Sequence, residues 1–399
     1  MEQKINMQKK IKINNGKVIL GDRIIPNGSV LIEDRKIIGV EEGDVDYPGS
    51  ITIDAMGNYI SPGFIDIHVH GGGGHDFMDG TVAAFLKVAE LHAKHGTTSM
   101  MPTTLTAEKE DILQTLDLYE KANDINTLGS SFIGMHLEGP YFSMAQRGAQ
   151  DPKYIRDPDP SEYLEILQHG SSIKRWSAAP EKKGAIEFGK ILCEKGILPS
   201  MAHTDAIYEE ALEAFENGYT LLTHFYSAMS GVTRRNAFRY AGVIEAGYLH
   251  DNLDVEIIAD GIHLPAPLLK LIYKIKGPAH TALITDAMRG AGMPEGDSIL
   301  GNINTGMKVI VEDGVAKLPD RSSFAGSVAT ADRLVRTMIN MAELPLLDTI
   351  KMITETPARI MKLNDKIGSL KKGMDADILI FNQQIEMQSV IIKGNLITQ

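Results

Sequence analysis

Residues 61–360 alternate eight short β-branched runs with helical stretches, and this repeat restricts the possible folds more than any other feature. The runs are FIDIHVHG (64–71), TTSMMPTT (97–104), SFIGMHLEG (131–139), IKRWSAAPE (173–181), ILPSMAHTDA (197–206), LLTHFYSAM (221–229), DVEIIADG (254–261) and TALITDAM (281–288). Strands that alternate with helices pair in parallel. Eight such strands predict an α/β fold with a closed (β/α)8 TIM barrel. An open doubly wound sheet is the alternative, but no glycine-rich phosphate loop opens its first unit.

The two ends of the chain follow a different pattern. Residues 1–60 and 361–399 each contain short β-rich runs separated by turns, with no convincing helical period. Two β-rich ends that flank a different middle predict one small β-sandwich domain built from both termini. The expected division is therefore a sandwich from 1–60 and 361–399 around a barrel from 61–360.

Composition excludes several classes of function. The formal net charge of −12 argues against general nucleic-acid binding, which depends on clustered Lys and Arg. No apolar run is long enough for a membrane helix, and the charged N-terminus does not resemble a signal peptide. The single cysteine, Cys193, fits a reducing compartment, so we expect a cytoplasmic protein. We also expect Cys193 to be buried in a helix as a packing residue.

Metal-binding residue types follow the predicted strands at their carboxyl ends, the face where barrel active sites form. These residues are His68, His70, Glu138, His203, His224, His263 and Asp286. Any one of these histidines could be a hydrogen-bonded core imidazole, but that interpretation does not explain the set. Imidazole and carboxylate are ligands of zinc and related divalent metals. Residues two apart on a strand point the same way, so His68 and His70 can reach one ion together.

Several motifs resemble the amidohydrolase superfamily and, within it, the N-acetylglucosamine-6-phosphate deacetylases. They are SPGFIDIHVHG, GMHLEGPYFS, MAHTDA, THFYSAMS, ADGIHL, LITDAMRGAGMP, SSFAGS and GSLKKGMDADILIF, and together they cover nearly the whole chain in order. HLEGP and ADGIHL are the most specific of them. GFIDIHVHG and GMDAD indicate only the superfamily.

The resemblance implies a role for each metal-site residue. Glu138, His203 and His224 correspond to the central metal ligands of the family. Because His68 and His70 are both present, a second ion bridged by Glu138 is expected to be possible. The cofactor is therefore one or two divalent ions per subunit, Zn²⁺ or Fe²⁺. Asp286 corresponds to the general acid/base and can also touch the metal.

The same resemblance implies contacts to an amino-sugar phosphate. His263 and one arginine of the TRRNAFR segment, best matched by Arg235, are expected to bind the phosphate. In the family that arginine comes from a neighbouring subunit, which implies a homodimer. Ser227, Ala228 and Gln150 are also expected to contact the substrate. Ser227 stands where the family usually has Asn before Ala-Met, and Gln150 stands where some members have His. These departures lie around the substrate rather than the metal.

The expected reaction is hydrolysis of N-acetylglucosamine 6-phosphate to glucosamine 6-phosphate and acetate. The alternatives are the galactosamine or mannosamine isomers, a cyclic amidase of the dihydroorotase or hydantoinase type, and a metal-binding protein without catalysis. Cyclic amidases commonly use a modified lysine on strand four. In this chain, strand four ends in SAAPE. Its only lysine there, Lys174, lies at the opposite end of the strand.

Overall fold

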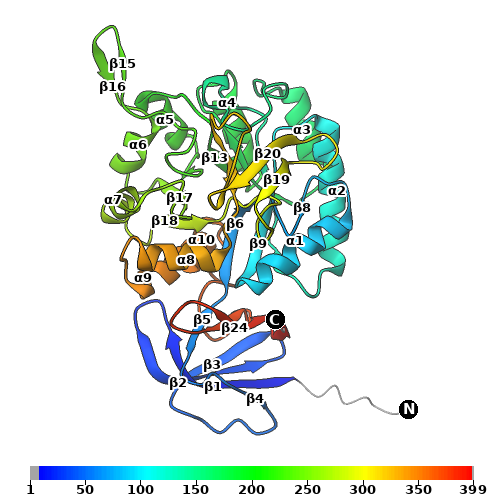
Figure 1. The fold of residues 1–399 in the computed structure, drawn as a ribbon, viewed down its shortest axis with the longest axis vertical. Coiled ribbons are helices and arrows are strands. Elements are labelled where there is room, and N and C mark those ends of the chain that lie inside the picture. The colour runs from blue at the N-terminus through cyan, green and yellow to red at the C-terminus, as the bar shows by residue number, and fades with distance from the viewer. Residues whose placement is uncertain (1–8, 398–399) are drawn as a thin grey trace.

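The computed structural model describes residues 9–397, and its main feature is a barrel of parallel strands surrounded by helices (Figure 1). The barrel strands are β6 (Phe64–Val69), β9 (Thr97–Thr104), β10 (Ser131–Phe132), β11 (Met135–Glu138), β12 (Ile173–Ala178), β13 (Leu198–Met201), β14 (Leu221–Leu222), β17 (Asp254–Ile258) and β18 (Thr281–Ile284). All of their pairings are parallel, and β10 and β11 together occupy the third strand position. The predicted TIM barrel is confirmed.

Main-chain hydrogen bonds close the barrel between its first and last strands. The Asp286 amide donates to the His68 carbonyl at 2.9 Å, and the His70 amide donates to the Ala287 carbonyl at 2.9 Å. This seam places the HxH motif beside the end of the last strand. Two sequence segments more than 200 residues apart therefore meet at one face of the barrel.

The helices lie outside the strands (Figure 1). They are α1 (Val82–Lys94), α2 (Lys109–Ile125), α3 (Pro160–His169), α4 (Ala185–Glu194), α5 (Tyr208–Glu216), α6 (Val243–Leu249), α7 (Ala266–Lys276), α8 (Ala331–Asn340), α9 (Leu346–Ile353) and α10 (Glu355–Ile360). Helix α1 shows why they form: the Thr81 side chain accepts from the Ala84 amide as an N-cap, and Phe85 and Val88 belong to the buried face.

Both chain ends contribute to a smaller β-rich part below the barrel (Figure 1). Its strands are β1 (Lys10–Ile19), β2 (Ile24–Glu33), β3 (Lys36–Glu42), β4 (Ile51–Asp54), β5 (Tyr59–Pro62), β23 (Ile378–Phe381), β24 (Met387–Ile392) and β25 (Asn395–Ile397). One hydrogen-bonded sheet joins all eight, and β5 pairs with β23 across the two ends of the chain. Buried side chains such as Ile13, Val30 and Ile378 give this part a core of its own.

An antiparallel sheet that we did not predict from the sequence follows the last barrel strand. Its strands are β19 (Gly296–Leu300), β20 (Met307–Glu312), β21 (Val315–Lys317) and β22 (Phe324–Ser327). Figure 1 shows β19 and β20 in front of the upper half of the barrel. Short elements complete the fold: β7 (Gly71–Gly72), β8 (His75–Asp76), the 3-10 turn Met144–Gln146, β15 (Thr233–Arg235) and β16 (Phe238–Tyr240).

Two expectations outside the site can be compared directly with the structure. The expected burial of Cys193 is wrong, because its side chain is exposed near the end of α4. The cause is the helix's orientation, which buries the face that carries Phe188 and Leu192 instead. Among the described residues, no helix combines the length and the apolar character needed to cross a bilayer.

Candidate metal centre

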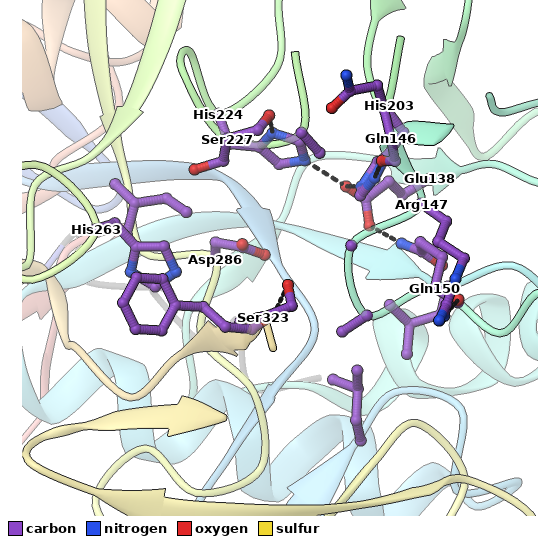
Figure 2. Close-up of a pocket in the computed structure, with 18 of the residues that line it drawn as sticks. Glu138, Gln146, Arg147, Gln150, His203, His224, Ser227, His263, Asp286 and Ser323 are labelled. Carbon is purple, nitrogen blue, oxygen red and sulfur yellow. Dashed lines mark hydrogen bonds and ion pairs between the residues drawn. The ribbon is translucent and has the colours of Figure 1, made fainter. Parts of the chain in front are cut away.

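Six of the predicted residues converge at the carboxyl end of the barrel, and Figure 2 labels four of them, Glu138, His203, His224 and Asp286. The six are His68, His70, Glu138, His203, His224 and Asp286, and each is at most 8% exposed. Two groups of three potential ligands share the Glu138 carboxylate, one with His68 and His70 and the other with His203 and His224. In each group the ligand atoms lie within 4.8 Å of one another. We call His68 and His70 the strand-one pair, and His203 and His224 the loop pair.

The strand-one pair is positioned by β6 and by the barrel seam. His68 Nε2 and His70 Nε2 lie 3.4 Å from opposite oxygens of Glu138, Oε1 and Oε2 respectively. Asp286 Oδ1 is 3.4 Å from the first nitrogen and 3.1 Å from the second. On its other side, His68 Nδ1 donates to the buried Glu256 carboxylate at 2.9 Å. Asp286 therefore lies against the strand-one pair.

The loop pair lies just past the ends of β13 and β14. His203 and His224 have φ values of 46° and 32°, in the left-handed region that non-glycine residues seldom adopt. Their Nε2 atoms lie 3.4 Å and 3.0 Å from Glu138 Oε1. Their Nδ1 atoms donate to the main-chain carbonyls of Gln146 and Ser227 at 2.9 Å and 3.1 Å. Those bonds leave the Nε2 atoms directed at the carboxylate.

The donor set fits a divalent metal. Four imidazoles and two carboxylates in a buried site match the ligand preferences of zinc and iron. In the metal-free protein, burial alone would lower the pKa of His68, but the Glu138 and Asp286 carboxylates raise it to about 9. Burial alone would raise the pKa of Glu138, yet His68 and the loop pair hold it well below its usual range. Protons thus supply the positive charge that bound ions would otherwise provide.

A cavity of about 580 Å³ opens above this centre, a size suited to a small ligand. Of the residues expected to contact substrate, Gln150, Ser227, Ala228 and His263 line it. The His263 ring packs on Phe324, with ring centroids 4.7 Å apart. Figure 2 shows His263 and Ser323 on the side of the cavity opposite Gln150.

Gln150 and His263 are both fixed by hydrogen bonds. The Gln150 amide nitrogen donates to Glu138 Oε2 at 2.7 Å, and its oxygen accepts from the Thr106 amide and hydroxyl at 2.9 and 2.8 Å. His263 Nδ1 lies 2.8 Å from Asp260 Oδ2, so that carboxylate orients the ring. The Arg235 side chain lies outside what the structure describes. Its strand, β15, belongs to a hairpin that projects away from the barrel (Figure 1).

Sequence patterns missed four cavity or supporting residues. Arg147 lies in the loop before Gln150, and Phe324 comes from the antiparallel insertion. Glu256 and Arg175 lie beneath the centre, inside the barrel. The available signal for the last two was a charged residue inside a predicted barrel strand, since burial of a lone charge is unfavourable.

Histidines around a shared carboxylate at the carboxyl ends of barrel strands define a metal-dependent barrel hydrolase. A family model described as the amidohydrolase family matches residues 59–397. The chain belongs to the amidohydrolase family.

Relatives and solved structures extend the comparison over nearly the whole chain. An N-acetylglucosamine-6-phosphate deacetylase of Bacillus subtilis is 33% identical and covers 98% of both chains. An N-acetylgalactosamine-6-phosphate deacetylase of Escherichia coli O157:H7 is 31% identical, covering 88% of this chain and 90% of the relative. The N-acetyl-D-glucosamine-6-phosphate deacetylase structure from Mycobacterium smegmatis is 28% identical, with a TM-score of 0.88 over 98% of this chain and 100% of its own.

Proposed function

We propose that this protein hydrolyses the acetamide of N-acetylglucosamine 6-phosphate to give glucosamine 6-phosphate and acetate. The observation that carries the proposal is the Glu138 carboxylate shared by two histidine pairs, with Asp286 beside it on the floor of the cavity. The choice of sugar is supported by near full-length relatives with this named activity. Of the one or two divalent ions expected per subunit, we propose two, Zn²⁺ or Fe²⁺, because two groups of three potential ligands share Glu138.

Asp286 has the position and charge of a general base. Burial alone would raise the pKa of its carboxyl, but His68 and His70 lower it, so the group is ionised and can accept a proton. A bound divalent ion would bring the pKa of a water towards about 7 and polarise the amide carbonyl. Asp286 would take the water proton and return it to the departing amine, which is a poor leaving group while unprotonated.

Two groups are proposed for the phosphate end of the substrate. His263 lines the cavity with its ring oriented by Asp260. Arg235 would come from the second subunit of a homodimer, since its hairpin projects from the barrel and exposes Phe238 by 73%. Guanidinium suits bidentate phosphate recognition. Arg235→Ala should raise KM for the sugar phosphate while Arg234→Ala on the same hairpin does not, and sedimentation would report the dimer.

The cyclic-amidase alternative has less support. Lys174, the one lysine of the fourth strand, is exposed near the amino end of β12, while the metal-site residues lie at the carboxyl end. Glu138 already occupies the bridging position between the two pairs. The galactosamine isomer stays as the second candidate because relatives with that named activity also match.

We place the protein in the cytoplasm on the strength of its single cysteine.

The test is acetate release by the zinc-loaded protein from four compounds. They are N-acetylglucosamine 6-phosphate, its galactosamine and mannosamine isomers, and unphosphorylated N-acetylglucosamine. We expect fast turnover of the first compound only. Preference for an isomer would change the substrate, and absence of acetate from all four with zinc bound would refute the deacetylase assignment.

A further inference from the structure

A buried ion pair lies inside the barrel directly beneath the metal centre. Glu256 on β17 and Arg175 on β12 are both 0% exposed. Arg175 donates to both carboxylate oxygens, at 2.6 Å to Oε2 and 2.8 Å to Oε1. Its remaining nitrogen-bound protons reach the Ser200 hydroxyl at 3.0 Å, the Thr223 hydroxyl at 2.7 Å and the Ile67 carbonyl at 3.2 Å. Such a pair is expensive to desolvate and is weak evidence of stabilisation, so its location calls for another explanation.

The pair contacts one of the four histidine rings of the metal centre. Glu256 Oε1 accepts from His68 Nδ1 at 2.9 Å. Because an ionised carboxylate can only accept, this bond places a proton on Nδ1 and leaves Nε2 as the nitrogen that faces Glu138 and can bind a metal. Arg175 holds the Glu256 carboxylate in place by donating to both of its oxygens. The bond thus sets both the tautomer and the ring orientation of His68.

His68 differs from the other three histidines in this anchor. His203 and His224 each donate their Nδ1 proton to a main-chain carbonyl. The buried Nδ1 of His70 has no hydrogen-bond partner. Within the strand-one pair, then, His68 is the member with a fixed ring, and its anchor is a carboxylate. Carboxylate partners of ligating histidines raise the basicity of the ligand as well as orienting it.

We propose that Glu256, held in place by Arg175, is a positioning residue that aims His68 at the ion of the strand-one pair. This inference rests on the proposed metal-dependent function. It predicts that loss of the Glu256 carboxylate weakens binding of that ion and spares the ion of the loop pair. Glu256 also accepts from the His224 amide at 3.3 Å, but the His224 ring is held separately by a main-chain carbonyl.

The chain contains a matched control on the same strand. Asp254 accepts from both terminal nitrogens of Arg359, at 2.7 and 3.0 Å, and from His280 Nδ1 at 2.8 Å. It therefore has the same kinds of partner as Glu256, but it lies at the amino end of β17, away from the metal centre. A variant at Asp254 measures the cost of breaking a carboxylate–arginine–histidine cluster as such.

The experiment measures zinc per subunit in the full-length protein. Metal-free protein is dialysed against buffered free zinc at graded concentrations, and bound zinc is counted by mass spectrometry. We expect two ions in the wild type and in Asp254→Asn. In Glu256→Gln, one ion should bind with unchanged affinity and the other about 10- to 100-fold more weakly. Adding Glu256→Gln to His68→Ala should change zinc affinity no further, because Glu256 acts through His68.

Three outcomes would overturn the proposal: wild-type zinc binding in Glu256→Gln, equal losses of zinc affinity in Glu256→Gln and Asp254→Asn, or further loss of zinc affinity in the His68→Ala background.

If Glu256→Gln does not fold, Arg175→Met with Glu256→Met removes both buried charges together and should fold. In that double variant, one zinc ion must again bind more weakly than in the wild type. Normal affinity for both ions would refute the proposal. Zinc counts do not depend on substrate, so failure of the deacetylase assay would leave this result standing.

Discussion

The two histidine pairs reach the same carboxylate by different structural routes. The strand-one pair belongs to β6 and the residues directly after it, where the two-residue period aligns the rings. The loop pair follows the last residues of β13 and β14, and both of its members adopt left-handed backbone. Half of the metal centre is thus set by regular secondary structure. The other half depends on turns that only the folded barrel can hold.

The loop pair carries a conformational cost that the strand-one pair does not. Left-handed backbone at a non-glycine residue costs on the order of 1–3 kcal/mol, and it persists only where the surroundings enforce it. The rings of this pair are fixed by main-chain carbonyls, and the His203 ring also packs on Phe142 with centroids 4.5 Å apart. A bound ion would add to these restraints. Asp286, which lies against the strand-one pair, also has left-handed backbone, with a φ of 46°, so backbone strain occurs on both sides of the centre.

The largest effect should come from removing what the two pairs share. Glu138→Ala deletes the carboxylate that both pairs approach, so both ions should bind weakly and acetate release should fall to the background rate. Zinc counting and the acetate assay check this together. If one ion bound normally, the two pairs would not share Glu138 as described.

The Asp286 side chain contacts only the strand-one pair among the four histidines. Asp286→Asn should therefore lower the catalytic rate more than it lowers the affinity for metal. Asn keeps an oxygen near His70 but cannot take up a proton, so kcat should fall about 10²- to 10⁴-fold while zinc content stays normal. Single-turnover acetate release from the zinc-loaded variant measures this loss. Full activity in that variant would assign proton transfer to another group.

A smaller effect is expected at Gln150, whose amide donates to the Glu138 oxygen on the His70 side. Gln150→Ala should weaken the ion of the strand-one pair by about tenfold, as loss of an outer partner of a ligand does. The variant also leaves the Thr106 amide without its acceptor, so its thermal midpoint should be recorded beside zinc affinity. A change in KM with normal zinc affinity would make Gln150 a substrate contact instead.

The smallest effect is a pH dependence confined to the metal-free protein. The folded-state pKa values of His68, about 9, and of His70 lie above their ordinary value of 6.5, because nearby carboxylates outweigh burial. Their stabilisation is therefore fully present below about pH 6.5 and is lost as pH rises through 9. Zinc displaces these protons, so the thermal midpoint should fall over this range more in metal-free than in zinc-loaded protein. Equal slopes would contradict the assigned charges.

The sequence was informative where a periodic element positions a residue. The barrel, the strand-one pair and the gathering of the metal-site residues at one face follow from strand period and from the rule that barrel sites form at the carboxyl face. The central place of Glu138 was implied by the family resemblance. The antiparallel insertion that supplies Phe324 was missed, although Asp313 and Gly314, both at positive φ, form the two-residue turn between β20 and β21, and Asp-Gly is a hairpin signal that the sequence shows. Hydrogen-bond partners such as Glu256 for His68 depend on contacts across the barrel, which no local pattern encodes.

The most direct test of the account is acetate release from N-acetylglucosamine 6-phosphate as zinc is returned to metal-free protein. The account predicts no turnover without metal, activity that rises with bound zinc, and only residual activity in Asp286→Asn at every zinc level. Turnover by the fully metal-free protein, or zinc binding by the Glu138 centre without any acetate release, would contradict it.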